Sequence, residues 1–195
     1  MENRIDESVK FGQNVVIEDD VVIGPGCKIG HQCVLKSGTR MGRNVDFADL
    51  CCTTGLCYIG NDVAVRTRST ISKGVIVEDR AFIGAGVMTS HTKSIYHHRP
   101  GADRRQYITR IGMGAVIGSS SNLMAGVYVL SNVIVGYASN VVKDLLVVGV
   151  YFGNPAKIVL DVPMQACVDY PENWEPHAFS KEELKRYLPY ALESE

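Results

Sequence analysis

Large apolar residues recur at every sixth position along most of this 195-residue chain. The series consists of Phe11, Ile17, Ile23, Ile29, Leu35, Met41, Phe47, Thr53, Ile59, Val65, Ile71, Val77 and Ile83 and, after an interruption, Ile111, Ile117, Leu123, Val129, Val135, Val141 and Val147. Four residues after each position stands a mostly small side chain, such as Val, Cys, Ala or Ser. Neither an α-helix, with about 3.6 residues per turn, nor an alternating strand would keep this frame. The fixed period predicts a solenoid, and specifically an all-β parallel β-helix.

We expect each hexad to form one short strand and a corner, so that three hexads close one triangular coil. The large residue of each hexad, Val147 included, would fill the interior, and the small residue would lie where the chain turns inward. Glycine often follows the large residue, as in Gly12, Gly42 and Gly118, and we expect these glycines to supply positive φ at the corners. Because parallel coils stack about 4.8 Å apart, the hexads predict roughly six to seven coils and a prism roughly 30 Å tall.

The frame is interrupted between Val87 and Ile111 by about sixteen extra residues. We predict that a loop over about 89–107 is extruded there from one corner of the prism. It contains three histidines and three arginines: His91, His97, His98, Arg99, Arg104 and Arg105. A polar, titratable loop on a rigid scaffold is a frequent arrangement of a functional site. The alternative is a solvated loop whose charges serve only solubility.

The chain divides into a hexapeptide-repeat domain over residues 1–160 and a C-terminal extension over residues 161–195. In the extension, Ser180 and Glu183 have the spacing of a capping box and predict a short helix that reaches Leu188. Pro189 would end or bend this helix. We expect the extension to pack on a coil face or on a neighbouring subunit, with Trp174 as its packing anchor.

Composition narrows the class of protein. Hydrophobic residues make up 46% of the chain, enough for one continuous core. The net charge of −1 argues against a nucleic-acid surface. No apolar stretch approaches the roughly 20 residues of a membrane span, and the first residues lack the basic start and apolar run of a signal peptide.

Cysteine usage points to a reducing, cytoplasmic setting. Four of the six cysteines fall on the series of small residues: Cys27, Cys33, Cys51 and Cys57. At such positions cysteine acts as a small buried hydrophobic residue, so we expect packing thiols rather than a metal site.

The hexads, the extruded loop and the ending Gly153-Asn-Pro-Ala-Lys157, preceded by Val142-Lys143-Asp144, resemble the hexapeptide-repeat acyltransferases. The resemblance covers residues 9–160. It implies a left-handed β-helix, a homotrimer with sites between neighbouring subunits, and acetyl-CoA as cosubstrate in the groove between two prisms, with no metal. The activity it implies is acetyl transfer to a hydroxyl or amine of a sugar or nucleotide-linked sugar, as in surface polysaccharide biosynthesis.

Acyl transfer from a thioester needs a base for the acceptor and donors for the developing oxyanion. A neutral imidazole suits the base at cytoplasmic pH. In the sugar O-acetylating members a histidine stands at the start of the loop, and this resemblance assigns His91 as the general base, with His97 or His98 as alternatives. The short spacing before His91 also resembles members that N-acetylate nucleotide-linked sugars, so O- and N-acetylation both stay open.

Position-by-position carry-over implies a second set of residues for acetyl-CoA: Ser119, Tyr137, Val142, Lys143 and Lys157. The two lysines would meet the phosphates. For the acceptor we expect Arg66, Arg68 and Lys73, together with His97, His98 and Arg99 of the loop. Cations there favour a phosphorylated or carboxylated acceptor; for the first three the alternative is a salt-bridged outer face.

Two other classes remain open. A γ-class carbonic anhydrase-like protein would bind zinc through three histidines, for which the loop offers His91, His97 and His98. A non-catalytic β-helix scaffold subunit would keep the repeat but bind no CoA.

Overall fold

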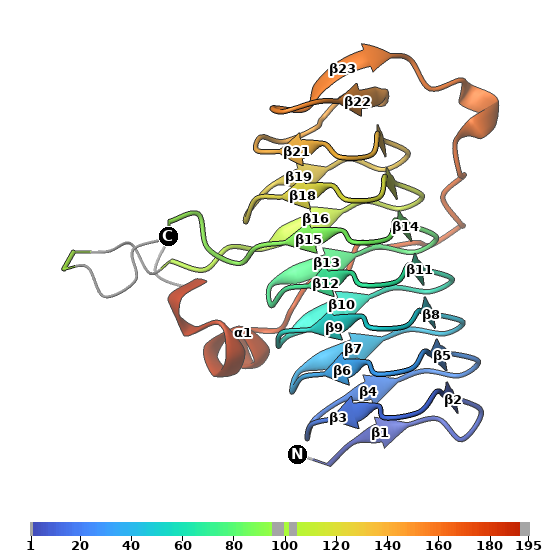
Figure 1. The fold of residues 1–195 in the computed structure, drawn as a ribbon, viewed down its shortest axis with the longest axis vertical. Helices are drawn as coiled ribbons and strands as arrows, with labels where there is room; N and C mark the ends of the chain where they lie inside the picture. The colour runs from blue at the N-terminus through green and yellow to red at the C-terminus, as the bar shows by residue number, and fades with distance from the viewer. Residues whose placement is uncertain (1, 95–99, 102–104, 192–195) are drawn as a thin grey trace.

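The computed structural model describes residues 2–94, 100–101 and 105–191. Strands of two to four residues stack into three sheets that form the faces of a prism (Figure 1). Up to residue 141, consecutive strands of the chain visit sheets A, B and C in turn, and strand residues pair in parallel with residues one coil later, as Ile5 does with Ile23. The predicted hexapeptide-repeat β-helix is confirmed.

Within the described ranges, sheet A contains β1 (Arg4–Ile5), β4 (Val22–Ile23), β7 (Thr39–Met41), β10 (Cys57–Ile59), β13 (Val75–Val77), β16 (Thr109–Ile111) and β19 (Tyr128–Val129). Sheet B contains β2 (Lys10–Phe11), β5 (Lys28–Ile29), β8 (Asp46–Phe47), β11 (Ala64–Val65), β14 (Phe82–Ile83), β17 (Val116–Ile117), β20 (Ile134–Val135), β22 (Val150–Phe152) and the antiparallel β23 (Lys157–Leu160). Sheet C contains β3 (Val16–Ile17), β6 (Val34–Leu35), β9 (Cys52–Thr53), β12 (Thr70–Ile71), β15 (Met88–Thr89), β18 (Asn122–Leu123) and β21 (Asn140–Val141).

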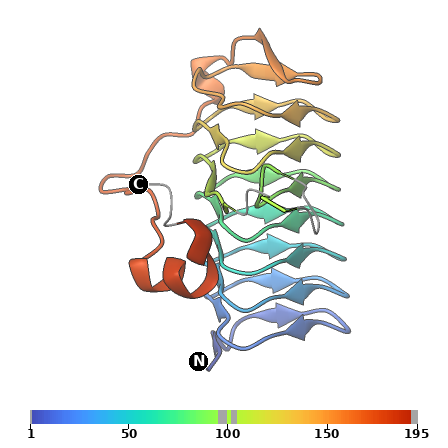
Figure 2. The same cartoon turned by 90° about the vertical axis from the view of Figure 1, so that its left-hand side faces the viewer.

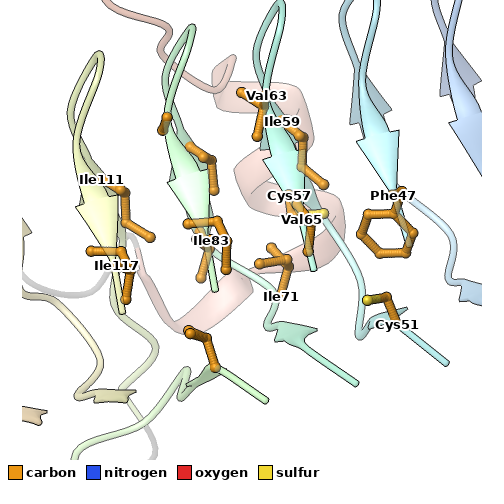
Figure 3. Packing of buried hydrophobic residues seen from close by; sticks show 14 of the residues in the cluster. Phe47, Cys51, Cys57, Ile59, Val63, Val65, Ile71, Ile83, Ile111 and Ile117 are labelled. Atoms are coloured by element: carbon orange, nitrogen blue, oxygen red, sulfur yellow. The ribbon is translucent and has the colours of Figure 1, made fainter. Parts of the chain in front are cut away.

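The core is a column of side chains along the prism axis (Figure 3). Large residues such as Phe47, Ile59 and Ile83 are fully buried in it, as the series predicts, whereas Phe11, in the first coil, is 44% exposed. The small series is buried beside them, including the four predicted cysteines, which are free thiols. Burial raises the pKa of the Cys51 and Cys57 thiols to about 12, so both stay protonated and serve as packing groups.

The prediction about the corner glycines is wrong. Gly12, Gly42 and Gly118 do not have positive φ. They are needed because the next coil passes too close: a Cβ on Gly118 would lie 2.4 Å from the backbone nitrogen of Tyr137. Positive φ occurs instead three residues before most of the large residues. Asn and Gly stand at several of these positions, as at Asn44 and Gly86, and other residue types stand at the rest.

The stack extends beyond the predicted frame at both ends of the chain, and its last coil contains fewer residues than the others. The frame continues to Ile5 at one end and to Tyr151 at the other. Val147, expected in the interior, is 61% exposed, whereas Leu145 is 3% exposed. Leu145 bridges to Val129 and Tyr151 pairs with Val135, because the last corner is two residues shorter than the others.

The predicted loop leaves the prism between β15 and β16, at the corner where sheet C leads into sheet A (Figure 1). Stacking resumes beyond it without a break, since β13 pairs with β16 and β15 with β18. The insertion therefore leaves the scaffold intact on both sides of the loop.

The C-terminal extension returns along the outside of the stack (Figure 2). It contains a 3-10 helix, Met164–Ala166, then α1, Lys181–Tyr187, and a second 3-10 turn, Pro189–Ala191. The predicted capping box is present: the Ser180 hydroxyl accepts from the Glu183 N–H, and the Glu183 carboxylate accepts from the Ser180 N–H.

The extension packs on the outer face of sheet A. Phe179 and Leu188 are buried against Leu56 and Ile76. Trp174, expected to be the anchor, instead packs on Tyr170 within the extension, with ring centroids 4.8 Å apart. The packing role therefore belongs to Phe179 and Leu188.

A buried polar cluster adds to this contact. Glu78 is 2% exposed and pairs with the Arg110 guanidinium, which also donates to the His177 carbonyl at 2.8 Å. The His177 ring stacks on Tyr58 with centroids 3.7 Å apart. Burial raises the pKa of Glu78 despite the opposing charge of Arg110. The cluster joins the extension to β10, β13 and β16.

Two glycine substitutions test the stacking geometry. Gly112→Ala should lower the free energy of unfolding by about 1–3 kcal/mol or more, because its Cβ would lie 2.4 Å from the Ser131 nitrogen. Gly86→Asn should cost about 1 kcal/mol or less, because Asn adopts the same positive φ at Asn44 and nothing within 3.4 Å of the Gly86 Cβ position obstructs it. Urea denaturation measures both. Equal losses would contradict the assignment of the two glycine roles.

Candidate active site

A groove of about 560 Å³ lies on the outer face of sheet C beside the base of the loop. Its floor consists of outward-facing residues of four successive strands: Thr70, Met88, Asn122 and Asn140. The first loop residues, 90–93, form one wall, and Met124 and Val142 complete it at the corner. Met88 is 53% exposed, and the Asn122 amide donates to the Asn140 carbonyl oxygen at 2.9 Å. The groove thus combines apolar surface with paired carboxamides.

Hydrogen bonds hold the base of the loop to the coils on both sides. In the coil below, the Ser72 hydroxyl donates to the carbonyl of Thr89 at the loop base, at 2.6 Å. The Ser90 N–H donates to the Leu123 carbonyl at 3.0 Å, and the Ser90 hydroxyl accepts from the Ala125 N–H at 2.9 Å, in the coil above. The next residue, His91, therefore starts from a fixed backbone.

His91 lines the groove and is half-buried. Its carbonyl accepts from the Tyr107 N–H at 3.2 Å, which ties the two ends of the loop together. Burial, and next the positive charge of Lys73, lower the pKa of His91 below the ordinary histidine value. Both causes disfavour the imidazolium form. The imidazole is therefore neutral near pH 7 and able to accept a proton.

One lysine acts on this imidazole through its charge, and a second lysine lines the same groove. Lys73 occupies the same corner one coil below. Its backbone N–H donates to the Thr54 hydroxyl at 3.0 Å, and burial lowers the pKa of its side chain. Lys93, two residues after His91, lines the groove and holds its ammonium 4.5 Å from the centroid of the Tyr107 ring. The positive charge that disfavours the imidazolium form thus comes from Lys73, and Lys93 adds a second cation to the groove.

The residues expected to bind acetyl-CoA lie in three places: at the two edges of sheet C and at the end of sheet B. Val142 lines the groove, and Lys143 follows it, exposed, at the same corner. Ser119 and Tyr137 lie at the opposite corner, between sheets B and C, where the Ser119 hydroxyl accepts from the Ala85 N–H at 3.2 Å. Lys157 is exposed on β23, at the end of sheet B.

The cations expected to bind the acceptor are separated as well. Arg66 lies at the corner between sheets B and C, pairs with Asp46 at 2.8 Å and lies over the Phe82 ring. Arg68 is exposed at that corner. Only Lys73 of the three is near His91. The other expected acceptor residues, His97, His98 and Arg99, lie outside the described residues.

Sequence reasoning missed several residues of the groove: Met88, Ser90, Lys93, Asn122 and Asn140. A signal for three of them was present. Met88, Asn122 and Asn140 each precede an inward-facing residue of sheet C by one position. Their alignment becomes visible only when the extra residues of the loop are removed from the count, so that Met88 pairs with Asn122.

The described part of the chain shows no group of three His, Cys, Asp or Glu side chains arranged to hold a metal ion. Two of the three histidines that the zinc alternative requires, His97 and His98, lie outside that part. Among the residues with a defined placement, no helix is long and apolar enough to cross a membrane.

Comparisons with known proteins agree with the fold. A family model described as "Bacterial transferase hexapeptide (six repeats)" matches residues 4–48. A curated relative, "Bifunctional protein GlmU" of Heliobacterium modesticaldum, is 31% identical over 140 residues, which cover 70% of this chain and 28% of the relative. The chain thus spans less than a third of that relative's length.

Two solved structures share the architecture at low sequence identity. A hexapeptide transferase family protein from Anaplasma phagocytophilum has a TM-score of 0.56 at 14% identity, covering 84% of this chain and 81% of that protein. A variant of AntD, an N-acyltransferase from Bacillus cereus, in complex with dTDP and coenzyme A, has a TM-score of 0.54 at 18% identity, covering 80% and 85%. The chain therefore has the hexapeptide-repeat, left-handed β-helix fold.

The electrostatic setting of His91 can be measured directly. We expect the imidazole to titrate below the ordinary value of about 6.5, because burial and Lys73 disfavour its charged form. Lys73→Met should move the midpoint upward, since it removes the nearby positive charge. NMR of the imidazole Cε1–H resonances, assigned with His91→Gln, reads both values. A His91 midpoint above about 6.5 in the unchanged protein would contradict this account.

Proposed function

We propose that this protein is an acetyl-CoA-dependent acetyltransferase that acetylates a hydroxyl or amine of a sugar or nucleotide-linked sugar, with His91 as the general base. The observation that carries the proposal is the neutral, half-buried imidazole at the fixed base of the loop, facing a groove of about 560 Å³. The groove suits a pantetheine arm, which has two amides and short apolar segments, because it offers the Asn122–Asn140 carboxamides beside Met88 and Val142.

In the proposed reaction His91 accepts the proton of the acceptor hydroxyl or amine as that group bonds to the thioester carbonyl carbon. The carbon–sulfur bond then breaks, and the imidazolium returns the proton to the departing CoA sulfur. The products are the acetylated acceptor and CoA, and His91 is again neutral. The lowered pKa of His91 supports both proton transfers. The imidazole is unprotonated before the attack, and the imidazolium formed afterwards donates its proton easily.

The comparisons support acyl transfer in general. AntD, with the same fold, is an N-acyltransferase whose structure contains dTDP and coenzyme A. We further propose a homotrimer, because Ser119 and Tyr137 lie on a different edge of sheet C from His91 and Val142. A second copy that brings its own edge to the groove would complete the CoA site. We place the enzyme in the cytoplasm, where acetyl-CoA is supplied.

Replacement of His91 tests the catalytic role. His91→Ala should lower kcat by roughly 10²-fold or more, because a general base contributes on that order. Turnover is measured as CoA release with a panel of amino-sugar and hydroxyl-bearing nucleotide sugars. His31→Ala is the matched control: His31 lies in a distant coil, where its Nδ1 accepts from the Gln13 N–H at 2.9 Å. Near-normal turnover of His91→Ala would remove His91 from this role.

Binding of acetyl-CoA can be tested without knowing the acceptor. Calorimetric titration should show micromolar-range binding, which Lys157→Ala weakens because it removes a charge expected at the CoA phosphates. Lys10→Ala, an exposed lysine at the other end of sheet B, should leave the affinity unchanged. Lack of binding by the unchanged protein would reject the acetyltransferase proposal and favour the scaffold or zinc alternatives.

A further inference from the structure

We propose that Lys73 and Lys93 form an anion site beside His91 that selects acceptors carrying a phosphate group. This inference rests on the proposed acetyl transfer and names its substrate class. It also changes which residues are expected to bind the acceptor. These cations are the two lysines at the base of the loop, and Arg66 and Arg68 are not among them.

The first argument is the lack of counterions. Two cations in the coils below this corner are paired: Lys36 with Glu18 at 2.5 Å, and Arg40 with Asp20 at 3.2 Å. Within the described ranges, no carboxylate lies within ion-pair distance of Lys73 or Lys93. A half-buried cation without a counterion is costly. An anionic ligand would offset that cost at Lys73, whose pKa burial already lowers.

The second argument is that both side chains are held in place. The stem of Lys73 lies against Gly55, where an added Cβ would be 3.1 Å from the Lys73 Cβ. The Lys93 ammonium lies over the face of Tyr107, a favourable cation–π arrangement. Tyr107 in turn packs on Gly126, where an added Cβ would be 3.0 Å from the Tyr107 Cβ. Packing therefore holds the stem of Lys73, and the contact with Tyr107 holds the ammonium of Lys93 at the loop base.

The third argument concerns which anion can reach them. With the thioester at His91, the pantetheine arm keeps the CoA phosphates away from this end of the groove. An anion beside His91 must therefore belong to the acceptor. Two lysines, each a compact point charge, match the two negative charges of a diphosphate better than the single charge of a carboxylate. A nucleotide-linked sugar fits this requirement, whereas a neutral sugar leaves both lysines unpaired.

Direct titration with UDP and with inorganic pyrophosphate tests the site independently of catalysis. The unchanged protein should bind both, and Lys73→Gln and Lys93→Gln should each weaken binding by about tenfold or more. Lys93→Arg should restore most of the affinity, because Arg keeps the charge and the contact with the Tyr107 ring. Lys36→Gln is the matched control, since Lys36 lies at the same corner but is already paired with Glu18; it should bind normally.

Several results would overturn the inference. Equal UDP affinity in the unchanged protein and in the Lys73→Gln/Lys93→Gln double variant would place the phosphate elsewhere. Binding of glucuronate in preference to UDP and pyrophosphate would assign the site to a carboxylate. Acetyl-CoA affinity, measured on the same double variant, separates the two proposals. We expect it to be retained, and its loss together with UDP binding would show that the lysines serve the CoA phosphates instead.

Discussion

The structure depends on the close stacking of successive coils. The backbone N–H groups of each coil donate to carbonyl groups of the next coil, so residues one coil apart must adopt the same conformation. The stacking distance leaves no room for a Cβ at positions such as Gly118, and it places a large side chain in the interior at every sixth residue. The same register that builds the core also aligns outward-facing residues into columns on each face.

The groove is a consequence of this alignment. Thr70, Met88, Asn122 and Asn140 stand in one column on sheet C, although the loop separates the second from the third by many residues. The loop adds polar groups at the end of this column without disturbing the strands. Hydrogen bonds from Ser72 and Ser90 fix its base to both neighbouring coils. A rigid scaffold thus presents His91 with little backbone freedom, which its proposed role as a general base requires.

The C-terminal extension covers the outer face of sheet A and meets the loop at its base. A Cβ on Gly74 would lie 2.6 Å from the Tyr107 carbonyl and 3.5 Å from a methyl group of Leu188. The two segments, far apart in the sequence, therefore share one contact point at the corner next to Lys73. The extension occupies sheet A, while the groove opens on sheet C, so packing of the tail leaves the candidate site accessible in this chain.

The sequence alone determined the architecture, because each interior position of a hexapeptide solenoid depends on local spacing only. The core residues, the buried cysteines, the extruded loop and the Ser180–Glu183 cap could all be predicted in this way. His91 could be proposed from the position of the loop and from family resemblance. The end of the last coil could not be predicted from the sequence. There a corner is two residues shorter than the others, so that Leu145 occupies the interior in place of Val147.

Only the tertiary structure decided which polar residues share a site. Arg66 and Lys73 are seven positions apart, yet they lie at opposite edges of sheet C, so that Arg66 pairs with Asp46 and Lys73 acts on His91. Lys93 lines the same groove as His91 at the base of the loop, where its ammonium contacts the ring of Tyr107 at the other end of the loop. The physical reason is that a repeat specifies which way a side chain points, in or out. Which faces meet, and which charges remain unpaired, depends on where the loop and the extension return to the stack.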